Sequence, residues 1–101
     1  MKKFTVFENP SDTIKPYLFN DLINDLKKGR EIEFAYDNIE CAITNSRGKW
    51  WFTQGKDSME IFGFEEKELL VQKIETLMVS GIPLQNIFSE LMYTSNSLYI
   101  L

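Results

Sequence analysis

The sequence contains no histidine among its 101 residues, and this absence excludes several kinds of active site. Without an imidazole the chain cannot build a Ser-His-Asp triad or a Cys-His pair, and it lacks the side chain that most often transfers protons near neutral pH. Metal sites with histidine ligands are excluded for the same reason. Because no other catalytic signature is present either, we expect a protein that is not an enzyme.

The sequence has a single cysteine, Cys41, and no long hydrophobic run. One thiol cannot form an intramolecular disulfide, and thiolate-ligated zinc or iron–sulfur sites need several, so we expect no metal and no cofactor. The first apolar stretch ends at Glu8, which makes it too short for a signal peptide. No segment approaches the roughly 18 apolar residues of a membrane span. Together with the unpaired thiol, these features favour a cytoplasmic protein.

Positive charge is scarce in the second half of the chain. Residues 51–101 hold seven acidic and three basic residues, whereas residues 1–50 hold eight of each, so the net charge of -4 arises in the second half. Nucleic-acid binding depends chiefly on Lys and Arg side chains that neutralise phosphates, and anionic membrane surfaces attract the same side chains. The charge balance therefore argues against a nucleic acid and against a membrane as the partner.

The composition that remains is that of one globular domain, with 44% hydrophobic, 14% aromatic and 26% charged residues. No repeat, low-complexity tract or linker divides the chain, so residues 1–101 are predicted to form a single domain. A chain of this length buries roughly two-thirds of the surface that its unfolded form exposes. That is enough for one hydrophobic core without disulfide or metal cross-links.

Helical periodicity occurs in two parts of the sequence. Leucines recur every four residues within 16–28, and Gly29 follows as a stop signal, so a helix is predicted there. Residues 65–79 show the same period, and a shorter helix is predicted to begin at Pro83. Each helix has an apolar stripe along one side, so all of them are expected to pack against a common core.

Between these helices, four segments alternate apolar and polar residues and are separated by turn residues, which predicts an antiparallel meander. The apolar tail is expected to dock against the fold, for example as an edge strand. The predicted fold class is α+β, a four-stranded antiparallel β-meander that an N-terminal strand or the tail could extend, packed on one face by about three helices. The strands are predicted at 30–36, 39–44, 49–53 and 58–62, with a β-prone run at 4–7 and the tail at 98–101.

Turn lengths predict which residues lie opposite one another in the sheet, because strand side chains alternate between its two faces. We expect a two-residue loop at 37–38 and four-residue loops at 45–48 and 54–57. These loops place the large apolar residues of all four strands on one face, which is assigned to the core. The predicted pairs are Tyr36 with Ile39, Phe34 with Cys41, Ile32 with Ile43, Ile43 with Trp50, Cys41 with Phe52, Phe52 with Met59, and Trp50 with Ile61.

The opposite face is predicted to carry Trp51 between Ala42 and Glu60, with Glu33 beyond Ala42 and Glu40 diagonal to it. Tryptophan is enriched at binding hot spots. The carboxylates around it would suit Lys or Arg side chains of a partner, as ion pairs and as cation–π contacts. The candidate partner-binding residues are Trp51, Glu33, Glu40, Glu60 and Glu31, and Ala35, Thr44, Lys49, Thr53, Ser58 and Phe62 are predicted on the same face.

Each of these features has a structural alternative. The C-terminal helix or the tail could fold across this face and make Trp51 part of a second small core. Glutamates on an open sheet can serve solubility alone. Cys41 is predicted to be a buried, inert thiol rather than a nucleophile. Paired carboxylates hydrolyse glycosides, but a meander of this size seldom provides the deep cleft that such enzymes need.

The segment from about Leu18 to Leu91 resembles a pattern found in many small, mostly uncharacterised proteins of bacteria and their phages. In size, charge and build, the chain is also similar to the immunity proteins of bacterial toxin systems, which bind a toxin domain and block it. This second similarity identifies no individual residues. The first pattern runs through Leu22 and Leu26, then Gly29-Arg30-Glu31-Ile32-Glu33-Phe34-Ala35-Tyr36, Ile43-Thr44-Asn45, Lys49-Trp50-Trp51-Phe52, a helix, and Leu84 with Ile87-Phe88.

We therefore expect a non-enzymatic protein-binding module, most concretely an immunity-type inhibitor that occludes a basic toxin or effector protein. Acidic groups would steer the encounter and Trp51 would anchor the partner. The alternative is a small homodimeric bacterial or phage accessory protein with no toxin partner. In that case Trp51 and the apolar C-terminus would form the dimer surface.

Overall fold

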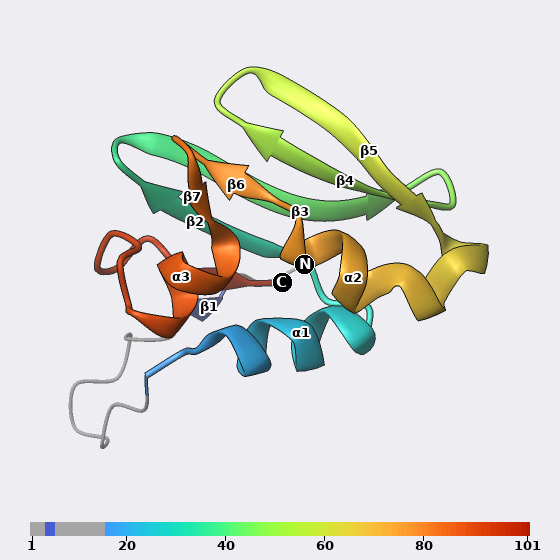
Figure 1. Cartoon of the computed structure of the whole chain (residues 1–101), viewed down its shortest axis with the longest axis horizontal. Coiled ribbons are helices and arrows are strands. Elements are labelled where there is room, and N and C mark those ends of the chain that lie inside the picture. The colour runs from blue at the N-terminus through green and yellow to red at the C-terminus, as the bar shows by residue number, and fades with distance from the viewer. Residues whose placement is uncertain (1–3, 6–15) are drawn as a thin grey trace.

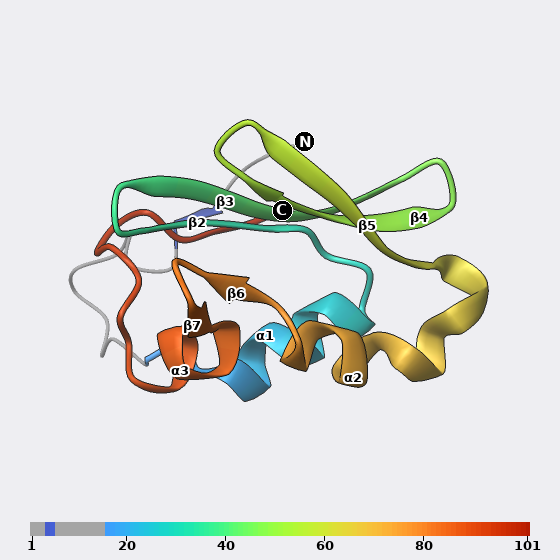
Figure 2. The same cartoon turned by 45° about the horizontal axis from the view of Figure 1, so that its top comes forward.

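A computed structural model describes residues 4–5 and 16–101, and within these ranges the chain forms two layers (Figures 1 and 2). One layer is a six-stranded antiparallel sheet, and the other holds three α-helices, one 3-10 helix and a small two-stranded hairpin. The α+β class with an antiparallel meander is confirmed. The strands are β1 (Phe4–Thr5), β2 (Ile32–Tyr36), β3 (Ile39–Ser46), β4 (Lys49–Gln54), β5 (Asp57–Gly63), β6 (Met78–Val79), β7 (Ile82–Pro83) and β8 (Tyr99–Ile100), and the helices are α1 (Phe19–Lys27), the 3-10 helix η1 (Phe64–Leu69), α2 (Leu70–Glu75) and α3 (Leu84–Ser89).

Both ends of the chain widen the meander, and the order of strands in the sheet is β1-β8-β2-β3-β4-β5. Tyr99 in β8 pairs with Glu33 in β2, and β1 pairs with the other side of β8. The amide of Leu101 continues this contact by donating a hydrogen bond of 2.8 Å to the carbonyl oxygen of Glu31. The tail is therefore docked as expected, but it lies inside the sheet rather than at its edge. Residues 6–7 of the predicted first strand lie outside the described residues.

Helix α1 begins three residues later than predicted and ends where its stop signal stands. The carboxylate of Asp21 accepts a hydrogen bond of 2.9 Å from the Leu18 amide, which satisfies an N–H group before the first turn. At the other end, Gly29 has φ +85°, and the amide of Arg30 donates to the carbonyl oxygen of Asp25 at 3.0 Å. This left-handed glycine cap is the usual way for a helix to end.

The prediction of a single helix over 65–79 is wrong. Its first part is the 3-10 helix η1, its middle is α2, and its end is strand β6. Ser80 and Gly81 do not cap a helix but form the turn of the β6–β7 hairpin, with φ of +53° and +79°. Val79 is fully buried in this hairpin, so packing against the core outweighs the helical period of the segment. The helix expected at Pro83 is confirmed as α3, which begins one residue later.

The register between β2 and β3 agrees with the prediction at every pair, and Asp37 and Asn38 have the positive φ of a type I′ turn. Between β3 and β4 the predicted four-residue loop is wrong. Arg47 and Gly48 form a two-residue turn with φ of +54° and +75°, so that Ile43 pairs with Phe52 instead of Trp50. This change moves β4 by two residues, and because two residues are one strand repeat, no side chain changes face.

The pairing of Phe52 with Met59 between β4 and β5 is confirmed, but a bulge follows it. Trp50 pairs with Phe62 rather than with Ile61. The extra residue turns Phe62 into the core, where it is 3% exposed and stacks on Trp50 at a centroid distance of 6.2 Å. Its predicted place on the open face is therefore wrong. Met59, predicted to be in the core, is 50% exposed because β5 is an edge strand whose first four residues are all exposed.

The core lies between the sheet and the helices. Phe88 of α3 is fully buried at its centre, and its ring contacts Phe34 of β2 at a centroid distance of 4.9 Å and Tyr93 at 5.1 Å. In the described ranges, every buried side-chain nitrogen or oxygen has a hydrogen-bond partner. The buried apolar residues are Tyr17, Phe19, Leu22, Ile23, Leu26, Ile32, Phe34, Cys41, Ile43, Trp50, Phe52, Ile61, Phe62, Leu70, Ile74, Leu77, Val79, Leu84, Ile87, Phe88, Tyr93 and Leu98.

Candidate functional site

The helices and the β6–β7 hairpin all lie against one face of the six-stranded sheet, as Figure 2 shows. The opposite face, called the open face below, carries Trp51 and the candidate glutamates on β2–β5 and just before β2. Helix α3 packs into the core through Ile87 and Phe88, and the tail lies within the sheet as β8. Neither of them crosses the open face, so Trp51 is not part of a second core formed by these segments.

Trp51 lies in the middle of β4, partly buried, with Thr44 opposite it on β3 and Glu60 opposite it on β5. Its indole N–H donates a hydrogen bond of 3.3 Å to the carbonyl oxygen of Ser46. The predicted neighbour on β3, Ala42, pairs with Thr53 instead because of the two-residue change in register. The hydrogen bond holds the indole toward the turn between β3 and β4.

Glu60 lies beside Trp51 as predicted, and its carboxylate forms an ion pair of 3.1 Å with the ammonium of Lys49. Both side chains are nearly half exposed, at 46% and 47%. An ion pair at such exposure contributes little to stability because water and salt screen it. Its effect is to place one positive and one negative charge next to the indole.

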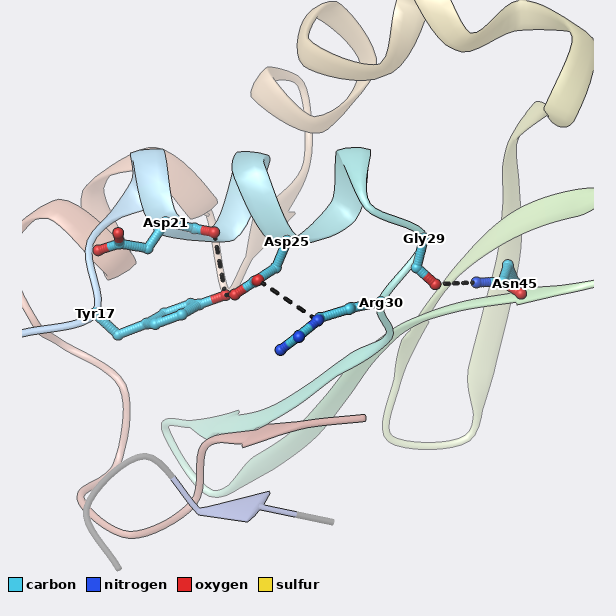
Figure 3. A network of polar contacts seen from close by, with 6 residues as sticks. All are labelled: Tyr17, Asp21, Asp25, Gly29, Arg30 and Asn45. Carbon is cyan, nitrogen blue, oxygen red and sulfur yellow. Dashed lines mark hydrogen bonds and ion pairs between the residues drawn. The ribbon is translucent and has the colours of Figure 1, made fainter. Parts of the chain in front are cut away.

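Glu31 has a structural contact. Its carboxylate accepts a hydrogen bond of 2.8 Å from the amide of Asn45, and the side chain of Asn45 donates to the carbonyl oxygen of Gly29 at 3.1 Å. Figure 3 shows Asn45 reaching across to the end of α1. These bonds join the segment between α1 and β2 to strand β3. The carboxylate of Glu31 therefore has a role in the fold.

Glu33 and Glu40 do not lie beside Trp51. Glu33 pairs with Ala42, Glu40 pairs with Ala35, and the carbonyl oxygen of Glu40 accepts a hydrogen bond from the amide of Gly55. Gly55 is four residues from Trp51 along the chain, which in an extended strand is about 13 Å. The predicted cluster of carboxylates around Trp51 is therefore wrong in part. Glu33 and Glu40 border a second region of the open face, which meets the first at Thr53, two residues from Trp51 on β4.

The second region is a groove of about 490 Å³. Ala35 and Ala42 form its floor, because their methyl groups rise less from the sheet than the surrounding side chains do. The groove also includes the tail, which the sequence analysis did not place on this face. Ser97 contributes through a hydroxyl that accepts a hydrogen bond of 3.0 Å from the Ala35 amide. The remaining lining residues are Glu33, Phe34, Glu40, Cys41, Thr53, Gly55 and Tyr99.

Tyr99 and Ser97 were missed because their contact with β2 joins segments more than sixty residues apart. The sequence does carry one signal for it. Polar Ser97 and amphipathic Tyr99 alternate with the apolar Leu98 and Ile100, as in a strand with one buried face. Leu98 is indeed fully buried, whereas Tyr99 borders the groove.

Cys41 is buried beneath this region, as predicted. Its thiol is near the carbonyl oxygen of Ile39, with sulfur and oxygen 3.6 Å apart. Burial raises the pKa of the thiol to about 11, since the charged thiolate is poorly solvated there. The thiol is therefore protonated at neutral pH and is not an activated nucleophile.

A second polar network lies on the helical side of the molecule (Figure 3). The Tyr17 hydroxyl donates to the carboxylate of Asp25 at 2.5 Å, and the Nε of Arg30 is 4.0 Å from the same carboxylate. Burial, reinforced by this hydrogen bond, raises the pKa of the Tyr17 phenol well above its usual value. The Tyr17 carbonyl oxygen in turn accepts a hydrogen bond from the Tyr93 hydroxyl. The network connects both ends of α1 to the rest of the fold.

No group of three or more His, Cys, Asp or Glu side chains within residues 4–5 and 16–101 is arranged to hold a metal ion. Over the same ranges, no helix is both long enough and apolar enough to span a bilayer. No protein-family model matches the chain, and neither does any curated protein or solved structure.

Proposed function

We propose that this protein is a non-enzymatic binding module that holds a basic protein partner on its open face, as an immunity-type inhibitor would. The observation that carries the proposal is the partly buried Trp51 in the middle of a sheet face that the helices leave open. Large aromatic side chains held on a rigid element contribute strongly to binding because they lose little conformational entropy. The hydrogen bond from the indole to Ser46 holds Trp51 in this way.

The charges on the open face favour a basic partner. On strands β2–β5 and at Glu31, this face carries four carboxylates but only the single ammonium of Lys49. Carboxylates on the same face as an aromatic anchor attract Lys and Arg side chains and speed up the encounter, and salt weakens this attraction. Inhibition would be steric, because the open face would cover the functional surface of the toxin that is bound to it.

The test is co-expression with the products of the reading frames that flank this gene, followed by titration calorimetry of any pair that forms. We expect one such product to be a basic protein whose toxicity the wild type relieves. Trp51→Ala should weaken its binding by about 10-fold or more, as expected of a hot-spot residue. Met78→Ala is the matched control, because Met78 is also a large apolar side chain at the surface of a strand, but belongs to the helical layer.

Two outcomes would contradict the proposal. In the first, no flanking gene product binds the wild-type protein. In the second, the Trp51→Ala variant binds as tightly as the wild type while circular dichroism shows that both are folded. A loss of binding that is equal in the Trp51→Ala and Met78→Ala variants would also contradict it, since the effect would then not belong to the open face.

Self-association is a second candidate, and Met59 is the observation that favours it. This side chain is 50% exposed on β5, one of the two edge strands of the sheet, and an exposed edge can pair with a second copy. The dimer surface predicted from Trp51 and the apolar C-terminus is reduced, because Leu98 is buried. Sedimentation velocity at micromolar concentration distinguishes the two candidates. A dimer that Met59→Lys dissociates would favour self-association. A monomer would favour the binding of another protein to the open face.

A further inference from the structure

We infer that two copies of the chain pair along strand β5, antiparallel to each other, with a two-fold axis beside Met59. This inference rests on self-association, the second candidate function, for which it specifies the contact. Strand β5 forms one edge of the six-stranded sheet (Figure 1). A strand added at this edge continues the sheet sideways and covers neither of its faces, so the contact is separate from the open face.

The edge at β5 lacks most of the features that keep the edges of sheets from pairing. Natural edge strands are blunted by short length, by Lys or Pro residues, by a bulge or by a covering segment. Strand β5 has seven residues without Lys or Pro, and its first four residues are all exposed. Its bulge lies beyond Glu60, so residues 57–60 form a regular strand. This part of the edge is open to another strand.

The pairing of β5 with β4 determines which backbone groups a second strand would meet. Gln54 and Asp57 flank a two-residue turn, so they form a hydrogen-bonded pair, and bonded and non-bonded pairs alternate from there along the hairpin. The backbone groups of Met59 are therefore bonded to β4. The N–H and C=O groups of Ser58 and Glu60 point away from β4, toward the outer side of the edge.

The side chains of β5 select the position of the axis. An axis at Met59 sets the two Met59 side chains opposite each other and Ser58 opposite Glu60 of the second copy, so the outward backbone groups bond reciprocally. An axis at Glu60 would set two carboxylates opposite each other, which is destabilising. An axis at Ser58 would set Met59 opposite the carboxylate of Asp57. Of these three, the first joins apolar side chains and opposes no like charges.

Two further observations fit an axis at Met59. Met59 shares the helix-facing side of the sheet with Phe52, but it is 50% exposed whereas Phe52 is 1% exposed. A second Met59 side chain would cover this apolar surface. On the other face, the ammonium of Lys49 is 3.1 Å from the Glu60 carboxylate, which reduces the repulsion between the two Glu60 side chains on the diagonal of the pair.

The experiment is disulfide cross-linking of the full chain, in which the native Cys41 is buried. Opposite residues of a non-hydrogen-bonded pair have Cα atoms about 4.5 Å apart, a distance that a disulfide can span. Met59→Cys should therefore form linked dimers at least about 10-fold faster than Met78→Cys under mild oxidation. Met78 is the matched control because it is equally exposed, at 51%, on a strand of the helical layer.

Two more variants test the register. Ser58→Cys alone and Glu60→Cys alone should link slowly, because the axis places each residue about 7–8 Å from its own copy, too far for a disulfide. A mixture of the two variants should form the mixed dimer, which mass spectrometry identifies, since residue 58 lies opposite residue 60 of the second copy. Sedimentation velocity of the wild type at micromolar concentration should show a dimer.

Three results would overturn the inference. They are a monomeric wild type, a linking rate for Met59→Cys no higher than that for Met78→Cys, and linking of Ser58→Cys alone as fast as that of the mixture. A dimer with the wrong cross-links would remove this contact and leave self-association standing. None of these measurements involves another protein, so binding at the open face, which Trp51→Ala tests, fails or stands separately.

Discussion

The amide of Gly55, in the turn between β4 and β5, donates a hydrogen bond of 2.8 Å to the carbonyl oxygen of Glu40 in β3. This bond continues the β3–β4 ladder beyond the pair of Cys41 and Gln54. It belongs to the register that places Thr44 rather than Ala42 opposite Trp51. Because Glu40 is held next to Gly55, it borders the groove and lies far from the indole. The β3–β4 register, to which this bond belongs, thus places Glu40 away from Trp51.

Replacing Glu60 by Gln should change stability by no more than about 0.5 kcal/mol, because its ion pair with Lys49 is nearly half exposed on both sides. Urea denaturation at low and at high salt measures this directly. The result decides how binding data are interpreted, since a stable variant shows that any loss of partner binding arises at the surface. A loss of more than about 2 kcal/mol would mean that the pair has a structural role.

Replacing Tyr17 by Phe removes the hydroxyl that donates to Asp25 and should lower the free energy of unfolding by about 1–2 kcal/mol at pH 7. The pKa of the phenol is raised on folding, first by burial and then by this hydrogen bond. A group with a raised pKa stabilises the fold while it is protonated, and its contribution is lost as the pH rises above its unfolded value of about 10.

The wild-type protein should therefore lose stability above pH 10, and the Tyr17→Phe variant should lose less over the same interval. Urea denaturation at pH 7, 9 and 11 measures both effects. Tyr36→Phe is the matched control, because Tyr36 lies on β2, outside the network of Tyr17 and Asp25. Identical alkaline sensitivity of the wild type and the Tyr17→Phe variant would contradict the assignment.

The thiol of Cys41 should be nearly inert in the folded protein. It is 3% exposed, and its pKa of about 11 leaves about one hundredth of the thiolate that a thiol with the ordinary value near 9 would have at pH 8. We expect an aromatic disulfide reagent to react at least about 100-fold more slowly with the native protein than with the protein in urea. Equal rates in the two states would show that the thiol is accessible in the native fold.

Arg47 occupies the left-handed region at φ +54°, in the first position of the two-residue turn between β3 and β4. Asn adopts this conformation more readily than Arg, so Arg47→Asn should stabilise the protein by about 0.5–1 kcal/mol. Arg47→Ala is the control, because it removes the same charge without relieving the backbone. Thermal unfolding followed by circular dichroism compares the three proteins. A lower melting temperature for the Asn variant would contradict the left-handed conformation of residue 47 in this turn.

The same turn shows where local sequence signals are strong and where they are weak. Asp37 and Asn38 both tolerate positive φ, so their turn type and the whole β2–β3 register could be predicted. Arg47 carries no such signal, and the loop was predicted two residues too long. The bulge at Ile61 has no local signature either, since it reflects the packing of Phe62 against Trp50. Each of these differences changes neighbours within the sheet.

The sequence by itself determined that Trp51 and the glutamates share one sheet face, because alternation along a strand is a local property and survives a register change of two residues. It also determined that this face is acidic. Only the tertiary structure decided which of these residues are neighbours, and that the tail supplies Tyr99 to the groove. Those relationships depend on hydrogen bonds between segments distant in the chain and on the side of the sheet that the helices bury, and no local pattern contains them.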